Sequence, residues 1–202
     1  MPDSFLGSLS GRTALVTGST RRGIGAATAM LLALEGASVV LNYGTGAKTI
    51  AARQRAQTLC DSLKSLNPKI ALIEAAVHSE SDVQSMFHQA AELFGGVDIL
   101  VNNAGGAWLE QDFAEIDTQH WNQAIRSEID GTFFCIREAL PHMRRQHWGR
   151  VIRFASTTRQ CDCSLMRTMV TLWTNTPLTS PSPSTRNAKS RSCWPYLSSS
   201  TA

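Results

Sequence analysis

The chain lacks any hydrophobic run long enough to cross a membrane. A membrane-spanning helix needs about 20 consecutive apolar residues, and the 202-residue sequence contains no such run. It also has no apolar stretch behind basic residues near its N-terminus, so no secretory signal is predicted. We therefore expect a protein of the cytoplasm that has no membrane partner.

A strong excess of charge of one sign is also missing. The 19 basic and 16 acidic side chains give a net charge of +3, and they form no basic stripe of the kind that binds nucleic acid. We therefore expect no nucleic-acid partner. The five cysteines are odd in number and unpatterned, so the sequence predicts neither a disulfide nor a metal site.

Glycine is absent after Gly149, although the chain contains 14 glycines. From Gln160 onward the sequence is rich in serine, threonine and proline, and its apolar residues follow neither a helix nor a strand period. Such a segment buries little apolar surface, so conformational entropy favours disorder. We therefore expect a folded domain over residues 1–158 and a low-complexity, disordered tail over residues 159–202.

Short apolar runs alternate with longer amphipathic stretches before this tail. Strands are expected at Thr13–Thr17, Ser38–Asn42, Ile70–Ala75, Val97–Val101 and Val151–Ala155. Helices are expected at Ile24–Leu34, Ala47–Leu66, Ser81–Phe94 and about Gln119–Arg145. Strands separated by helices favour parallel pairing, and apolar strands favour a sheet covered on both faces. The predicted fold class is α/β, a doubly wound parallel sheet with Rossmann-type topology.

Three glycines, Gly18, Gly23 and Gly25, lie between the first expected strand and the first expected helix. In a dinucleotide site, one such glycine permits a tight turn, one lets the backbone approach a pyrophosphate, and one brings helix and strand close together. The amide groups at the helix N-terminus then favour the phosphate charge. The pattern predicts nucleotide binding, with a purely structural turn as the alternative.

The residues around this turn also bear on the choice of cofactor. The second expected strand ends at Asn42 and Tyr43 without the acidic residue that usually binds the ribose of NAD. Arg21 and Arg22 lie in the glycine turn, and a guanidinium can bind the 2′-phosphate of NADP through two hydrogen bonds. We therefore expect NADP(H) rather than NAD, with two merely solvated arginines as the alternative.

Two motifs resemble those of the classical short-chain dehydrogenases/reductases. Thr17–Gly25 is similar to the family's Thr-Gly-x-x-x-Gly-x-Gly fingerprint, with four residues instead of three between its first two glycines. Asn102–Gly105 resembles the Asn-Asn-Ala-Gly motif, which supports the sheet and lines the cofactor. The resemblance implies an oxidoreductase that moves hydride between a nicotinamide and a small carbonyl or alcohol. The expected cofactor-binding residues are Gly18, Ser19, Arg21, Arg22, Gly23, Ile24, Gly25, Asn42, Tyr43, Val77, Asn103, Ala104 and Gly105.

Later residues extend this resemblance and also depart from it. Gly149–Ser156 is similar to the family's fifth strand, which implies that Ser156 is the catalytic serine that hydrogen-bonds the substrate carbonyl. Glu128 stands where the family usually has an asparagine that holds a water of the proton relay, and Ala76 stands where it often has an aspartate that touches adenine. The resemblance also implies self-association through the helix around residues 119–145.

The family's catalytic Tyr-x-x-x-Lys motif is missing, because Tyr43 and Tyr196 are the two tyrosines of the chain and neither fits it. In the family this tyrosine is the general acid, and the lysine lowers its pKa. We hypothesise that the chain is truncated or frame-shifted after about residue 158, which leaves the domain incomplete on its C-terminal side and inactive. The alternatives are a catalytically silent remnant that binds nucleotide or dimerises, and a non-functional mis-framed product.

Overall fold

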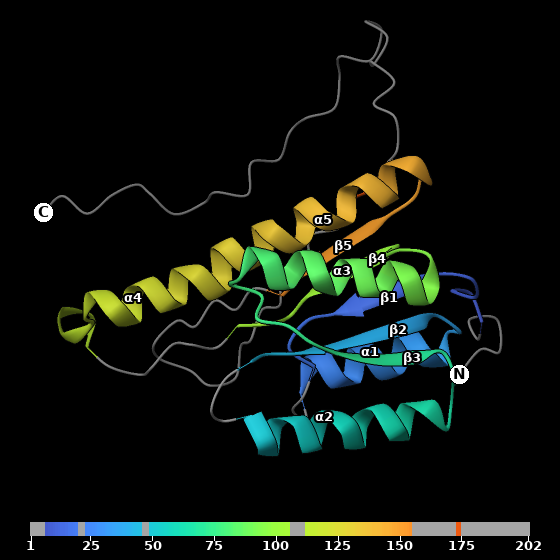
Figure 1. Ribbon diagram of the computed structural model, residues 1–202, viewed down its shortest axis with the longest axis horizontal. Helices are drawn as coiled ribbons and strands as arrows, with labels where there is room; N and C mark the ends of the chain where they lie inside the picture. The colour runs from blue at the N-terminus through green and yellow to red at the C-terminus, as the bar shows by residue number, and fades with distance from the viewer. Residues whose placement is uncertain (1–6, 20–22, 46–48, 106–111, 155–172, 175–202) are drawn as a thin grey trace, which may run out of the picture.

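The computed structural model describes residues 7–19, 23–45, 49–105, 112–154 and 173–174 (Figure 1). Its strands are β1 (Thr13–Val16), β2 (Ser38–Tyr43), β3 (Ile70–Glu74), β4 (Ile99–Asn102), β5 (Arg150–Arg153) and β6 (Trp173–Thr174). Its helices are α1 (Ile24–Leu34), α2 (Thr49–Lys64), α3 (Glu80–Phe94), η1 (Phe113–Glu115), α4 (Thr118–Ile125), η2 (Arg126–Asp130) and α5 (Gly131–Arg145).

The strands form one sheet in the order β3-β2-β1-β4-β5-β6. Strands β1 to β5 pair in parallel, whereas β6 pairs antiparallel with β5. The chain therefore builds outward from β1 to β3 and then returns to place β4 on the other side of β1. This reversal between β1 and β4 is the switch point of a doubly wound sheet, so the predicted α/β Rossmann-type fold is confirmed.

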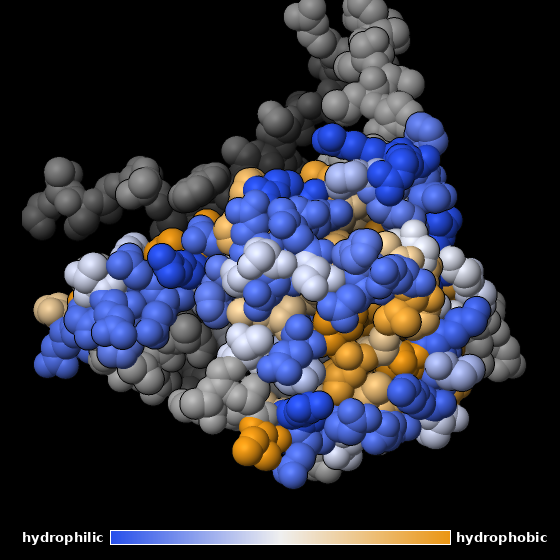
Figure 2. All heavy atoms as spheres, in the orientation of Figure 1, coloured by the Kyte–Doolittle hydropathy of each residue, from blue (hydrophilic) through white to orange (hydrophobic). Residues whose placement is uncertain are grey.

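Helices cover both faces of the sheet, with α3 and α5 on one side and α1 and α2 on the other (Figure 1). Neighbouring residues of a strand point to opposite faces. Leu15 and Leu100 therefore belong to the cluster under α3 and α5, while Val16 and Val101 belong to the cluster under α1 and α2. Figure 2 shows a mainly hydrophilic outer surface over α3 and α4, with hydrophobic side chains gathered between α3 and α2, where the edge strand β3 lies.

The long helix expected near residues 119–145 is present, but it is not uniform. It begins at Thr118 after the N-cap Asp117, whose side chain accepts a hydrogen bond from the His120 amide, and it continues from α4 through η2 into α5. The η2 segment is one π-helical turn, and such turns inside α-helices often mark functional sites.

The two residues of β6 lie within the segment predicted to be disordered, and the rest of residues 159–202 lies outside the described residues.

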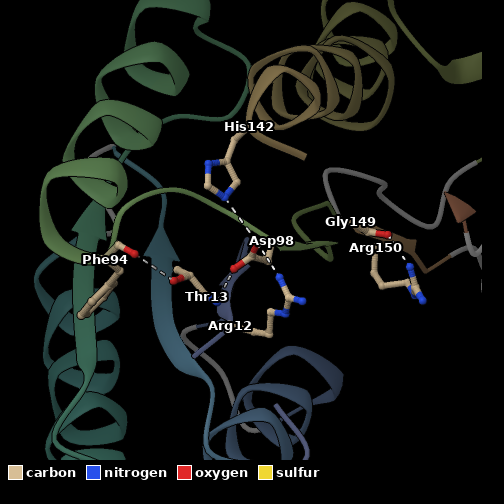
Figure 3. Close-up of polar contacts among 7 residues, drawn as sticks. All are labelled: Arg12, Thr13, Phe94, Asp98, His142, Gly149 and Arg150. Carbon is tan, nitrogen blue, oxygen red and sulfur yellow. Dashed lines mark hydrogen bonds and ion pairs between the residues drawn. The ribbon is translucent and has the colours of Figure 1, made fainter. Parts of the chain in front are cut away.

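A buried carboxylate ties three elements together at the edge of the sheet where the parallel strands begin (Figure 3). Asp98 is 6% exposed, and its Oδ2 accepts a hydrogen bond of 2.9 Å from the Thr13 amide. Its Oδ1 lies 3.3 Å from Nε2 of His142 and 3.6 Å from Nη1 of Arg12. Because Thr13 begins β1, Arg12 directly precedes it and His142 belongs to α5, Asp98 fastens the start of the sheet to the helix layer.

Candidate nucleotide-binding site

The candidate site lies at the other end of the parallel strands, where β1 and β4 end side by side. These two strands are paired in parallel, from Ala14 with Ile99 to Val16 with Val101. Because their crossover helices leave in opposite directions, the two following turns face one crevice, which is where ligands bind in open α/β sheets.

The turns after β1 and β4 are joined to each other by hydrogen bonds. Thr17 Oγ1 accepts from the amides of Asn103 and Ala104, at 3.0 and 2.9 Å. In the other direction, Asn103 Nδ2 donates to the carbonyl oxygens of Thr17 and Gly18, at 2.9 and 3.1 Å. The glycine turn and the Asn-Asn-Ala-Gly turn are thus one interlocked unit.

This joint explains why glycines occupy two of its positions. Gly18 has a φ of +63°, and a Cβ atom there would lie 2.7 Å from Cα of Ala104. A Cβ atom on Gly25 would overlap the Asn103 side-chain amide and lie 3.3 Å from Cα of Ser19. Both glycines therefore allow the close approach of the protein's own segments, in addition to any approach of a ligand.

Among the residues that the structure describes, no side chain caps the N-terminus of α1. Gly23 is the N-cap residue, its backbone is extended, no side-chain hydrogen bond caps the helix, and the first turn has no acidic residue. In contrast, α3 has Ser79 as its cap and Glu80 and Asp82 in its first turn. The first N–H groups of any helix lack intrahelical partners, so at α1 they can donate to an anion. These residues therefore fit the diphosphate of a dinucleotide.

The end of β2 holds the glycine turn in place. Asn42 is 1% exposed, and its Oδ1 accepts from the Gly18 amide at 3.3 Å, while its Nδ2 donates to the Ala75 carbonyl at 3.0 Å. The Asn42 carbonyl also accepts from the Ser19 amide at 3.0 Å. The side chain of Asn42 is therefore engaged inside the protein, and its predicted contact with a cofactor stays a prediction.

A carboxylate that the sequence did not reveal lies beside Tyr43. Glu74, the cross-strand partner of Tyr43 on β3, accepts a hydrogen bond of 2.9 Å from the Tyr43 hydroxyl. Burial is the main cause, and this hydrogen bond the second, that raise the pKa of Tyr43 above its usual value. The end of β2 has no acidic residue of its own, but the register between β2 and β3 places the Glu74 carboxylate beside it. This end of the sheet therefore carries a negative charge that the sequence of β2 alone does not predict.

Val77 lies where the chain leaves β3, next to the long helix. A Cβ atom on Gly131, the first residue of α5, would lie 3.0 Å from Val77 Cγ2. The preceding amide, that of Ala76, donates to Oδ2 of Asp82 on α3 at 3.1 Å. The turn after β3 is therefore held between α3 and α5 at the edge that carries the other predicted site residues.

Glu128 lies beside the residues that follow or end β4 and β5. It belongs to the π-helical turn η2, and a Cβ atom on Gly105 would overlap its Oε1 atom. Arg153, at the end of β5, donates from Nη2 to the Glu128 carbonyl at 3.2 Å and lies 3.9 Å from Oε2 of the same residue. Glu128, which the resemblance predicts to stand in place of an asparagine, therefore forms a charge pair with Arg153.

Other predicted residues are placed less completely. Arg21, Arg22 and Ser156 lie outside the described residues. Self-association through the helix around residues 119–145 stays a prediction, and this helix exposes the large side chains Trp121, Ile129 and Phe133. Within the described part of the chain, no cluster of three metal-ligating side chains is present and no helix is long and apolar enough to span a membrane.

Comparison with known proteins shows the family of the chain. Residues 12–166 match the short chain dehydrogenase family. The chain is 38% identical over 146 residues to D-beta-hydroxybutyrate dehydrogenase of Rhizobium meliloti, covering 72% of this chain and 54% of that protein. It is 33% identical over 147 residues to 3-oxoacyl-[acyl-carrier-protein] reductase of Staphylococcus aureus, covering 72% of this chain and 56% of that protein.

A solved structure supports the same family. A mutant short-chain dehydrogenase/reductase of Serratia marcescens superposes with a TM-score of 0.65 at 32% identity, covering 74% of this chain and 57% of that chain. The protein belongs to the short-chain dehydrogenase/reductase family, whose members are oxidoreductases that bind NAD(P). It spans about half the length of the curated relatives it matches.

Proposed function

We propose that this chain binds NADP(H) at the glycine turn and represents the nucleotide-binding part of an enzyme that moves hydride between the nicotinamide and a small carbonyl or alcohol. The observation that carries the proposal is the N-terminus of α1, which lies at the switch point of the sheet and has no side-chain cap among the described residues. The cofactor supplies the hydride chemistry, and the protein supplies binding, orientation and electrostatics.

Two parts of the cofactor and the substrate have proposed partners. The backbone amides from Gly23 to Gly25 hold the diphosphate. Arg21 and Arg22 bind the 2′-phosphate of NADP through their guanidinium groups. Ser156 orients the oxygen of the substrate carbonyl.

A second candidate, a catalytically silent nucleotide-binding protein, is favoured by the missing Tyr-x-x-x-Lys motif. Without a tyrosine whose pKa is lowered by a neighbouring lysine, the chain lacks the general acid by which the family gives a proton to the carbonyl oxygen. We propose that the 202-residue chain binds cofactor without measurable turnover.

The arginine pair provides the test of cofactor choice. Replacing Arg21 and Arg22 with alanine is expected to weaken NADPH binding at least about tenfold, which is about 1.4 kcal/mol, and to leave NADH binding unchanged because NADH has no 2′-phosphate. The control is the double replacement of Arg144 and Arg145, an exposed pair at the end of α5. Binding is measured as the cofactor-dependent rise in melting temperature, which follows from mass action.

Two outcomes would contradict the proposal. NADH that stabilises the wild-type protein as strongly as NADPH would remove the NADP preference. Failure of both cofactors to raise the melting temperature would remove the nucleotide site itself. In the same samples, loss of NADPH absorbance with a panel of small ketones would contradict the silent candidate and favour an active enzyme.

A further inference from the structure

The charge pair of Glu128 and Arg153 has a defined geometry. Arg153 is held by the Glu128 carbonyl at 3.2 Å, while its Nη2 lies 3.9 Å from the carboxylate, beyond hydrogen-bond distance. The other carboxylate oxygen lies against Gly105, in the space that a side chain at that position would fill. Glu128 and Arg153 are 27% and 38% exposed at their side chains, so water screens their charges only in part.

The position of this pair decides which part of a dinucleotide it faces. In a doubly wound sheet, each half of the sheet takes one nucleotide, and the ribose recognised at the end of the second strand belongs to the adenosine. Here that half consists of β1, β2 and β3, and the other half contains β4 and β5. Gly105 follows β4 and Arg153 ends β5, so Glu128 lies at the nicotinamide end.

The two redox forms of the cofactor differ in charge at that end. The oxidised nicotinamide ring carries a positive charge, and the reduced ring is neutral. A carboxylate fixed in a partly desolvated site stabilises a nearby cation more than a neutral group. The guanidinium of Arg153 opposes this effect only in part, because its Nη2 donates to the Glu128 backbone carbonyl and lies 3.9 Å from the carboxylate.

We propose that Glu128 is a specificity-determining residue that makes the site prefer the oxidised cofactor, NADP⁺, over NADPH. Because tighter binding lowers the free energy of the bound oxidised form, the preference shifts the equilibrium of a bound cofactor toward NADP⁺, which is the carbonyl-reducing direction. The inference rests on the proposed nucleotide site, and it adds a property that the glycine turn and the arginines cannot supply, because both redox forms share the same diphosphate and 2′-phosphate.

The experiment compares the dissociation constants of NADP⁺ and NADPH for the whole chain by calorimetry. Glu128→Gln, which keeps the shape of the side chain, is expected to weaken NADP⁺ binding about three- to tenfold and to leave NADPH binding unchanged or slightly tighter. Arg153→Gln is expected to act in the opposite direction, with tighter NADP⁺ binding, because it removes the opposing charge.

Glu74→Gln is the matched control, since it removes a carboxylate from the adenosine end of the same edge. It is expected to change the affinities for both redox forms by the same factor. A ratio of the two affinities that is the same in Glu128→Gln and wild type would overturn the inference, as would an equal change of the ratio in the Glu74 variant. If the wild-type chain binds neither form, the proposed function fails first and the inference falls with it.

Discussion

Replacement of Asp98 with asparagine is expected to lower the free energy of unfolding by about 2–4 kcal/mol. One oxygen of the Asp98 carboxylate accepts from the Thr13 amide, and the other lies beside His142 and Arg12 (Figure 3). An asparagine keeps one acceptor oxygen and turns the other position into a donor. If its NH₂ group points to the Thr13 amide, that buried donor loses its acceptor; if it points the other way, it faces the Arg12 guanidinium, and in both cases the negative charge beside Arg12 is lost. Denaturation by urea, followed by circular dichroism, measures the change.

The control for this variant is Asp61→Asn on the exposed face of α2, where the aspartate accepts one hydrogen bond from Gln57. We expect a change within about 0.5 kcal/mol, as is usual for surface substitutions. Equal stabilities of the two variants would show that Asp98 does not fasten the sheet to α5. Because Asp98 lies at the edge opposite the nucleotide site, NADPH affinity of the folded variant is expected to match that of wild type.

Replacement of Gly18 with alanine is expected to weaken NADPH binding at least about tenfold, or about 1.4 kcal/mol. The added methyl group would lie 2.7 Å from Cα of Ala104, which is backbone and cannot rotate away. The turns after β1 and β4 must therefore separate, and this breaks the hydrogen bonds that join Thr17 and Asn103. The left-handed φ of +63° adds a strain of about 1–2 kcal/mol. Calorimetry measures the affinity, and urea denaturation the stability.

Gly11→Ala separates the strain from the contact. Gly11 has a φ of +78°, and a Cβ atom there would meet nothing within 4 Å. This variant is expected to lose about 1 kcal/mol of stability and to bind NADPH as wild type does. If Gly18→Ala also bound NADPH normally, the interlocked turns would not form the cofactor site.

The periodicity of the sequence was sufficient to predict the fold. The β-branched runs and amphipathic stretches predicted all five parallel strands and the long helix, with ends that differ by a residue or two. The exact ends depend on hydrogen bonds between strands, which one sequence does not contain. Strand β4, for example, begins at Ile99 and not at the expected Val97, although the Asp98 amide donates to the Thr13 carbonyl and the Asp98 carbonyl accepts from the Arg150 amide.

The candidate site was predicted less completely, for the same physical reason. The glycines and Asn103 form recognisable local patterns, and the structure places them together. The carboxylate of Glu74 reaches Tyr43 because of the register between two strands, across 31 residues of sequence. The contact of Glu128 with Gly105 depends on a π-helical turn that no local sequence pattern predicted. Ser156 was predicted by family resemblance and lies outside the described residues.

Amide chemical-shift mapping by NMR tests the central claim most directly. On addition of NADPH, the amides of Gly23, Ile24 and Gly25 at the start of α1 are expected to shift most, because they donate to the diphosphate. Amides next to Asp98, at the far edge of the sheet, are expected to keep their positions. Shifts at that far edge, or none at the start of α1 under saturating cofactor, would contradict a nucleotide site at this turn.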